Sequence, residues 1–188
     1  DKAIKSCLEK GHLFLASSGN SGHDPSGKTR VGYPAIKEEV IAVGAVDQAD
    51  KPKTYSSTGP EVFCTSVSGV PAYNRFGTIQ NVEGTSFSQP IKSAVLGLIA
   101  LYLGRKINQD EAKAIVSNMS IDLGEPGRDI FNGYGIIKGG NIVENPIEEP
   151  EQPEQPERPI LPSHIVEINL KGLVEMWRYI GDAEVGKV

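Results

Sequence analysis

The deciding stretch of this sequence is Glu83-Gly84-Thr85-Ser86-Phe87-Ser88-Gln89-Pro90, which stands directly before a long apolar segment. A small residue, then Thr-Ser, then Pro a few positions later predicts a tight turn that becomes a helix. The hydroxyl of Ser86 would project from that turn, and free backbone N–H groups at the helix start can receive a developing oxyanion. This arrangement suits a nucleophile. The same residue types also suit an ordinary turn and helix cap, so the string alone leaves both interpretations open.

A second segment carries a candidate hydrogen-bond donor. Leu13-Phe14-Leu15-Ala16 is a short apolar run typical of a buried parallel strand, and it ends in Ser17-Ser18-Gly19-Asn20-Ser21-Gly22. Glycines on both sides of Asn20 allow a sharp turn at the carboxyl end of a strand, where open α/β sheets build their sites. An Asn amide there can donate to an oxyanion, although Asn is also favoured in such turns for its backbone alone.

Together with three further motifs, these segments resemble the subtilisin-like serine proteases, the subtilases. The likeness runs in unbroken order from residue 1 to about 143. It is carried by five stretches: Ala16–Gly22, Tyr33-Pro34-Ala35 with Val40–Asp47, Tyr55–Glu61, Gly84–Pro90 and Gly133–Ile137. The resemblance implies an α/β fold with a parallel sheet flanked by helices, and a serine endopeptidase that hydrolyses peptide bonds through an acyl-enzyme. Its partners would be peptide or protein substrates.

The resemblance also assigns roles to residues. Ser86 would be the nucleophile, and its backbone N–H together with the Asn20 side-chain amide would form the oxyanion hole. Seven residues would bind substrate, in two facing walls of the pocket for the residue before the scissile bond: Leu15, Ala16, Ser17, Ser18 and Gly19 on one side, Gly32 and Tyr33 on the other. No cofactor is required for this chemistry. The family leads us to expect a structural calcium ion on the backbone carbonyls of Ala35, Lys37 and Val40.

The sequence departs from the family in what it lacks. A serine nucleophile needs a base for its proton, and that base needs a carboxylate. The family's aspartate and histidine motifs, D-[ST]-G and HGTH, precede the serine, and neither occurs here. His12 is expected to be structural, His23 to lie in a surface loop, and His164 lies beyond the protease-like region.

Two explanations fit this absence. The chain is either the carboxyl-terminal part of a longer protease domain or a degenerate homologue, a non-catalytic binding or structural module with a protease-like groove. We favour the first, because Asp1 falls within an amphipathic helix pattern and because Ser86 and Asn20 are both present. The partner would then be the missing amino-terminal half of the domain, and the segment alone is expected to be inactive and incompletely folded or paired.

Composition excludes some other functions. The net charge is −5 and is concentrated between residues 146 and 159, so the rest of the chain offers no basic field for nucleic acid. No apolar run approaches the length of a membrane span. The two cysteines, Cys7 and Cys64, give neither a disulfide framework nor metal-ligand spacing.

The expected organisation follows from periodicity and breakers. Residues 1–145 form the carboxyl-terminal part of the protease domain, 146–162 a Pro/Glu-rich linker, and 163–188 a short extension. Residues 40–46 predict an interior parallel strand. Residues 88–104 predict a largely buried helix with Pro90 in its first turn, and Asn108 with Glu111 predicts a capping box for the next helix.

Overall fold

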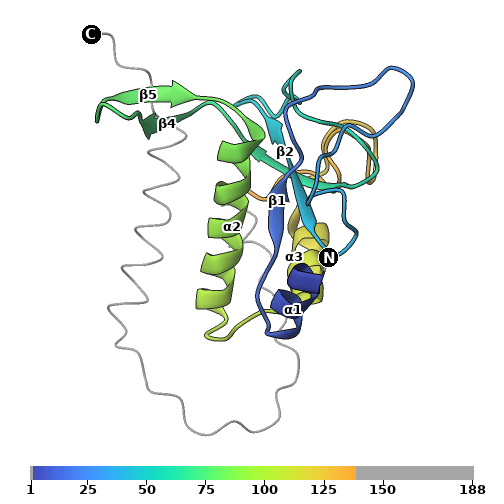
Figure 1. Cartoon of the computed structure of the whole chain (residues 1–188), viewed down its shortest axis with the longest axis vertical. Coiled ribbons are helices and arrows are strands. Elements are labelled where there is room, and N and C mark those ends of the chain that lie inside the picture. Colours follow the sequence, from blue (N-terminus) through green and yellow to red (C-terminus); the bar gives the residue numbers. More distant parts are fainter. Residues whose placement is uncertain (1, 139–188) are drawn as a thin grey trace, which may run out of the picture. The chain divides into compact units, whose positions relative to one another are not determined.

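The structure is a computed structural model that describes residues 2–138. The linker expected over 146–162 and the extension over 163–188 lie outside the described residues. Along the chain (Figure 1), the elements are α1 (Lys2–Glu9), β1 (Leu15–Ser17), β2 (Ile41–Val46), β3 (Val62–Val67), β4 (Val70–Tyr73), β5 (Ile79–Val82), α2 (Thr85–Tyr102) and α3 (Gln109–Met119).

The central feature is a parallel sheet with the strand order β1-β2-β3. β2 pairs in parallel with both neighbours, with Ala16 opposite Ala42 and Gly44 opposite Thr65. All six residues of β2 are buried, as its continuous apolar run predicts. β1 was predicted to be buried and is only half-buried, because it lies at the edge of the three strands and has a neighbour on one side only. The predicted parallel sheet flanked by helices is confirmed, with α2 on one side of the strands and α1 and α3 on the other (Figure 1).

α2 differs from its prediction at its start. It begins at Thr85, three residues before the expected Ser88, so that Pro90 lies inside the helix and not in the first turn. A proline in a helix interior has no N–H for the carbonyl four residues earlier, which here is that of Ser86. The Ser86 carbonyl therefore lacks its usual partner within the helix.

The burial of α2 also differs. The sequence predicted a helix buried almost all round, yet Ala94, Gly97, Leu101 and Tyr102 are exposed. The side chains of Leu101 and Tyr102 have 53% and 58% of their surface exposed. Apolar composition alone could not show which side of the helix has a neighbour within residues 2–138, since that depends on the elements packed around it.

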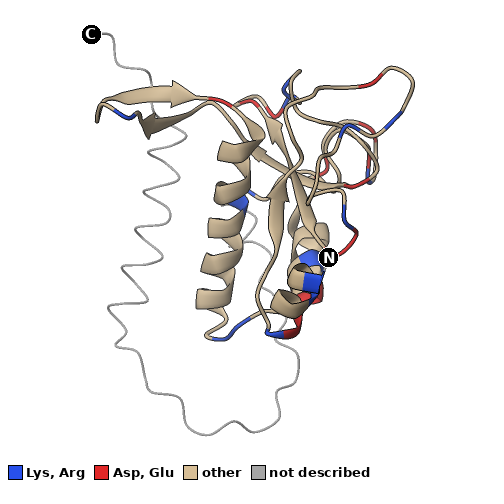
Figure 2. Ribbon diagram, in the orientation of Figure 1, with Lys and Arg blue, Asp and Glu red and all other residues tan. Residues whose placement is uncertain are grey.

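Lys92 is the only charged residue of α2 and the largest fully buried side chain among the described residues (Figure 2). Its Nζ has no hydrogen-bond partner within that part of the chain. Burial lowers the pKa of the Lys92 ammonium, and the nearby Cys64, itself fully buried in β3, opposes this slightly. An amine in such a place costs stability unless it is neutral.

α3 confirms its predicted cap. The Asn108 side chain accepts a hydrogen bond from the Glu111 N–H at 2.9 Å, and the Glu111 carboxylate accepts one from the Asn108 N–H at 2.7 Å. Gln109 then links the helix to the sheet, because its amide bonds both the N–H and the carbonyl of Phe14 at 2.9 Å. Ala112, Val116 and Met119 on its apolar face are buried, and Ile115 is half-buried.

β4 and β5 form an antiparallel hairpin directly before α2. Tyr73 at the end of β4, Phe76 in the turn and Ile79 at the start of β5 are all strongly exposed. Among the described residues, no helix is both long enough and apolar enough to cross a bilayer.

The buried amine predicts a pH effect on stability. The pKa of Lys92 is lowered from 10.5 in the folded chain, so between that lowered value and 10.5 the unfolded chain binds more protons. The free energy of unfolding should therefore rise with pH through this window and level off above it. Lys92→Met should remove the rise and stabilise the chain at neutral pH by roughly 1–3 kcal/mol.

Urea denaturation of the intact protein that contains this chain, and of its Lys92→Met variant, at a series of pH values measures this effect. The exposed Lys106→Met is the matched control and should keep the pH dependence of the original chain. Parallel curves for the original chain and Lys92→Met would contradict the assignment.

Candidate active site

Asn20 and Thr85 form the centre of the site. The Oδ1 atom of Asn20 accepts two hydrogen bonds from Thr85, one from its backbone N–H and one from its hydroxyl, both at 3.0 Å. Thr85 Oγ1 in turn accepts a hydrogen bond from the Gly19 N–H at 3.3 Å. Because two donors occupy Oδ1, the other end of the amide, Nδ2, is directed away from Thr85 and donates no hydrogen bond to any residue in the described part of the chain.

Ser86 lies in the first turn of α2 and is exposed. Helix N–H groups in this turn have no acceptor within the helix. The Thr85 N–H is bonded to Asn20, and those of Phe87 and Ser88 bond the Gly84 carbonyl at 2.9 and 3.4 Å. The Ser86 N–H has no such bond among the described residues, so it is free to donate to a ligand beside the hydroxyl.

The position of Gly84 shows that Ser86 and Asn20 face one space. A Cβ atom placed on Gly84 would lie 3.5 Å from Ser86 Oγ and 3.6 Å from Asn20 Nδ2. Both polar atoms therefore border the same point, although they are 66 positions apart in the sequence. Gly84 has a φ of 139°, a conformation that residues with a side chain rarely adopt.

Two side chains that the sequence analysis did not single out hold Gly84 in place. The Gly84 N–H donates to Ser68 Oγ at 2.9 Å and to Tyr55 Oη at 3.0 Å, and Tyr55 donates to Ser68 at 2.8 Å. Ser68 also donates to the Gly84 carbonyl at 3.3 Å. The motif around Tyr55 was visible in the sequence, but nothing there indicated that its hydroxyl reaches the turn before the serine.

The two predicted walls of the substrate pocket lie next to each other. The Gly32 N–H donates to the Ser18 carbonyl at 3.0 Å, which joins the loop after β1 to the segment at Gly32 and Tyr33. Ser18 is buried, Gly32 and Tyr33 are exposed, and the other four predicted residues, Leu15, Ala16, Ser17 and Gly19, are half-buried. Thus all seven belong to one connected region beside Asn20.

The histidines of this part of the chain do not complete a triad. His23 hydrogen-bonds Thr58 Oγ1 through Nδ1 at 3.1 Å, and its ring packs 4.9 Å from that of Phe131. His12 is exposed just after α1. Within residues 2–138, no side chain forms a hydrogen bond with Ser86 Oγ.

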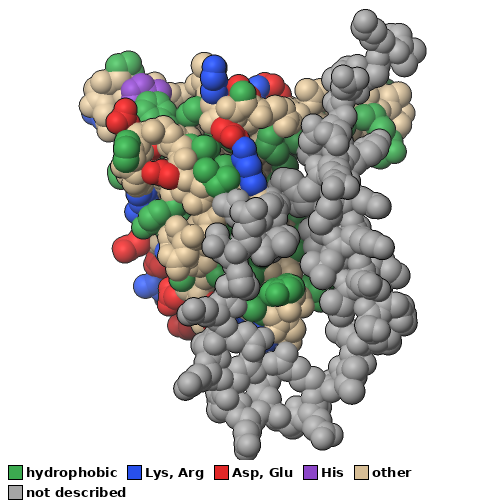
Figure 3. All heavy atoms as spheres, turned by 180° about the vertical axis from the view of Figure 1, so that it is seen from behind, with side chains coloured by type: hydrophobic (Ala, Val, Ile, Leu, Met, Phe, Trp, Pro, Cys, Tyr) green, Lys and Arg blue, Asp and Glu red, His purple; other side chains and the backbone are tan. Residues whose placement is uncertain are grey.

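The face of the molecule seen from behind carries acidic and basic side chains interspersed, with histidine at one corner (Figure 3).

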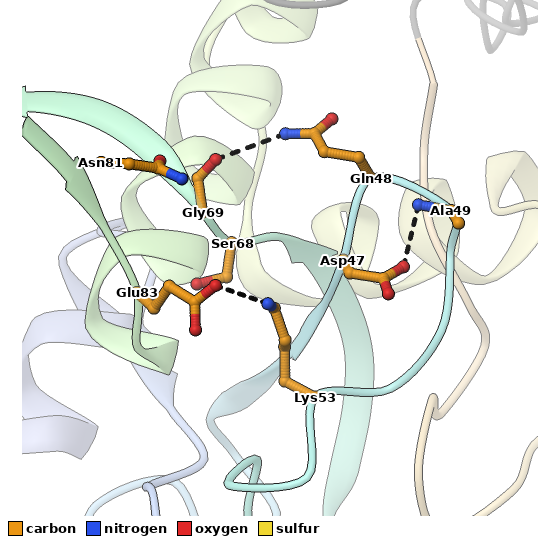
Figure 4. Close-up of a pocket in the computed structure, with 8 residues that line it drawn as sticks. All are labelled: Asp47, Gln48, Ala49, Lys53, Ser68, Gly69, Asn81 and Glu83. Atoms are coloured by element: carbon orange, nitrogen blue, oxygen red, sulfur yellow. Dashed lines mark hydrogen bonds and ion pairs between the residues drawn. The ribbon is translucent and has the colours of Figure 1, made fainter. Parts of the chain in front are cut away.

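A surface hollow of about 260 Å³ adjoins the turn before Ser86 (Figure 4). Glu83 and Lys53 form an ion pair in it, with Nζ and Oε1 2.5 Å apart. This bond raises the pKa of the Lys53 ammonium. Asp47 lies on the same hollow, and the N–H groups of Lys51 and Ala49 lower the pKa of its carboxyl. No motif in the sequence indicated that these charges gather here.

The fold and this arrangement define a class of protein. Residues 1–135 match the family model described as the subtilase family, and the chain belongs to that family of serine proteases. It is 33% identical over 141 residues to the minor extracellular protease Epr of Bacillus subtilis, which covers 72% of this chain and 20% of that protein. It is 31% identical to subtilisin DY of Bacillus licheniformis, covering 72% of this chain and 48% of the relative.

A solved structure agrees in fold. The crystal structure of a lanthipeptide protease superposes with a TM-score of 0.63 at 20% identity, covering 76% of this chain and 53% of that one. The chain thus spans about half the length of subtilisin DY and of this protease.

The geometry at Gly84 gives a test of the shared space. Gly84→Ala adds a methyl group in van der Waals contact with Ser86 Oγ and Asn20 Nδ2, at a φ that residues with a side chain rarely adopt, and it should lower labelling of the serine by a fluorophosphonate. Gly77→Ala is the matched control, because Gly77 also has a positive φ of 75° but its added Cβ meets nothing within 4 Å. A φ of 139° costs alanine more than a φ of 75°, so the free energy of unfolding of both variants is measured beside the labelling. Loss of labelling in a Gly84→Ala protein that is still folded supports the shared space, and full labelling would contradict it. The labelling is measured by mass spectrometry on the intact protein that contains this chain.

Proposed function

We propose that this chain is the part of a subtilisin-like serine endopeptidase that carries the nucleophile and the oxyanion hole. The observation that supports it most is the pair of bonds from Thr85 to Asn20 Oδ1, which leave Nδ2 facing the same space as the Ser86 hydroxyl. Such orientation before the substrate arrives is what stabilises an oxyanion, since no reorganisation is then needed.

The proposed reaction has two steps. Ser86 Oγ attacks the carbonyl carbon of the scissile peptide bond while a base removes its proton, and the oxyanion accepts hydrogen bonds from Asn20 Nδ2 and the Ser86 N–H. The C–N bond then breaks, the proton passes to the departing amine, and an acyl-enzyme remains on Ser86. Water cleaves this ester by the same route and frees the serine. The side chain before the scissile bond would lie between the Ser17–Gly19 and Gly32–Tyr33 walls.

We propose that the base and its carboxylate come from the amino-terminal half of the domain. Two features support a partner of that kind. Among residues 2–138, no strand pairs with β1 on the side away from β2, and α2 exposes the apolar Leu101 and Tyr102. A neighbouring element that covers both would bury apolar surface and satisfy strand-edge groups. The share of subtilisin DY that the chain spans, 48%, leaves room for such a half.

A non-catalytic binding or structural module remains the second candidate. It is favoured by one observation: among residues 2–138, no histidine or carboxylate forms a hydrogen bond with Ser86. The two functions differ in whether the serine reacts once the rest of the protein is present.

A calcium ion on the carbonyls of Ala35, Lys37 and Val40 stays a prediction. The Lys37 carbonyl accepts a hydrogen bond from the Val40 N–H at 2.9 Å, which closes a turn between two of the three residues. Within the described chain, no cluster of three or more His, Cys, Asp or Glu could hold a metal. An ion on carbonyls alone would brace this turn weakly, and it would take no part in hydrolysis.

The proposed function predicts that activity needs the upstream segment. The chain alone should give no peptide hydrolysis, and the chain joined to that segment should hydrolyse peptides and react with a fluorophosphonate. Ser86→Ala should lose both, whereas Ser117→Ala, on α3, should keep both. Rapid hydrolysis by the isolated chain would refute the requirement, and labelling of Ser86→Ala would refute the nucleophile. Absence of any reaction in the intact protein would favour the binding module.

Asn20 gives a second, graded prediction. Asn20→Ala in the intact protein should lower kcat by about 10²–10³-fold with little change in KM, because the lost bond acts on the transition state. Steady-state kinetics on a quenched-fluorescent peptide measure this. Asn118→Ala, an exposed asparagine on α3, is the control and should behave as the original protein. An unchanged kcat in Asn20→Ala would exclude the proposed donor.

A further inference from the structure

The hollow in Figure 4 lies at the carboxyl ends of two strands. Asp47 follows β2 directly, and Ser68 and Gly69 follow β3 directly. Asn81 comes from β5, and Glu83 from the turn before α2. Three segments, residues 47–53, 68–69 and 81–83, thus converge on one place, which makes it a product of the tertiary fold and not of one loop.

This hollow is joined to the candidate active site. Ser68, which lines it, exchanges hydrogen bonds with both the N–H and the carbonyl of Gly84. Glu83 is the residue before Gly84, and Ser86 follows two residues later. If the scissile bond of a peptide lies at Ser86, the few peptide residues beside that bond can therefore reach the hollow, because an extended chain advances about 3.3 Å per residue.

The order of the strands indicates which part of a peptide reaches it. The walls for the residue before the scissile bond follow β1 and lie beside Asn20. The hollow follows β2 and β3. The turn that carries Ser86 is hydrogen-bonded to Asn20 after β1 and to Ser68 after β3, so it lies between the walls and the hollow. The part of the substrate that departs as the amine extends away from the first pocket, and thus toward the hollow.

The charges of the hollow then select a kind of side chain. Asp47 and Glu83 are acidic and Lys53 is basic, which leaves one net negative charge among the lining residues. Only one oxygen of Glu83 is bonded to Lys53, and Asp47 uses one oxygen for the Ala49 and Lys51 N–H groups, at 2.8 and 2.9 Å. Each carboxylate keeps an oxygen with no bond from the described residues. Glu83 has 48% of its side-chain surface exposed, so a ligand can approach it.

We propose that this hollow binds a lysine or arginine side chain of the substrate, within the first three residues after the scissile bond. The inference rests on the proposed function, and it adds a substrate class to it. Glu83 and Asp47 attract the basic side chain, and Lys53 limits that attraction because it already neutralises part of Glu83. The hollow, at about 260 Å³, suits one long side chain and is smaller than the roughly 300–1,000 Å³ of a site for a whole small ligand.

The test uses the intact protein and peptides that carry Lys, Gln or Glu at each of the three positions after the scissile bond. At one of these positions, kcat/KM should be about fivefold higher for Lys than for Glu, the size expected of one partly exposed charge pair. Lys53→Met should widen this ratio, and Glu83→Gln should bring it close to one. Glu125→Gln, at an exposed position outside the hollow, is the matched control and should leave the ratio unchanged.

A second readout keeps this inference separate from the proposed function. The same peptides are titrated against the intact Ser86→Ala protein by fluorescence anisotropy, which needs no catalysis. A preference for Lys in binding that Glu83→Gln removes supports the hollow even if no peptide is cleaved, in which case only the proposed function falls. Cleavage with equal ratios in the original protein and Glu83→Gln overturns the hollow and leaves the protease assignment standing. Equal binding of Lys and Glu peptides, with no cleavage, overturns both.

Discussion

The double hydrogen bond from Thr85 to Asn20 Oδ1 is the contact on which the site depends. It ties the loop after β1 to the start of α2, two segments that are 65 residues apart in the sequence. It also settles the direction of the amide, because an oxygen that already accepts two bonds leaves the nitrogen to face the open space. Without it, the turn at Gly84 would be held on one side only, by Ser68 and Tyr55.

The features that the sequence predicted correctly have local signals. The apolar run of β2 needs burial on both faces, and Asn108 with Glu111 caps α3 through residues three positions apart. The placement of Asn20 and Ser86 around one space follows the family resemblance, since two short motifs far apart in a sequence have no local reason to meet. Their roles in catalysis stay predictions.

The features that the sequence missed depend on neighbours distant in the chain. The start of α2 at Thr85 is set by Asn20, which accepts the first N–H of the helix. Lys92 is buried because α2 packs against β2 and β3. The periodicity of the helix does not predict this burial, because Lys92 has both apolar and polar residues beside it in the sequence. The ion pair of Lys53 and Glu83 joins two loops 30 residues apart, so neither residue carries a motif.

Pro90 has a consequence for how α2 tolerates change. Since it offers no N–H to the Ser86 carbonyl, the first turn of α2 has one hydrogen bond fewer to the rest of the helix. Thr85 and Gly84, next to the serine, are hydrogen-bonded to other segments. Replacements farther along α2, even at the buried Lys92, therefore need not move the serine. The later turns of α2 can therefore vary in sequence, or be redesigned for stability, separately from the serine at the start of the helix.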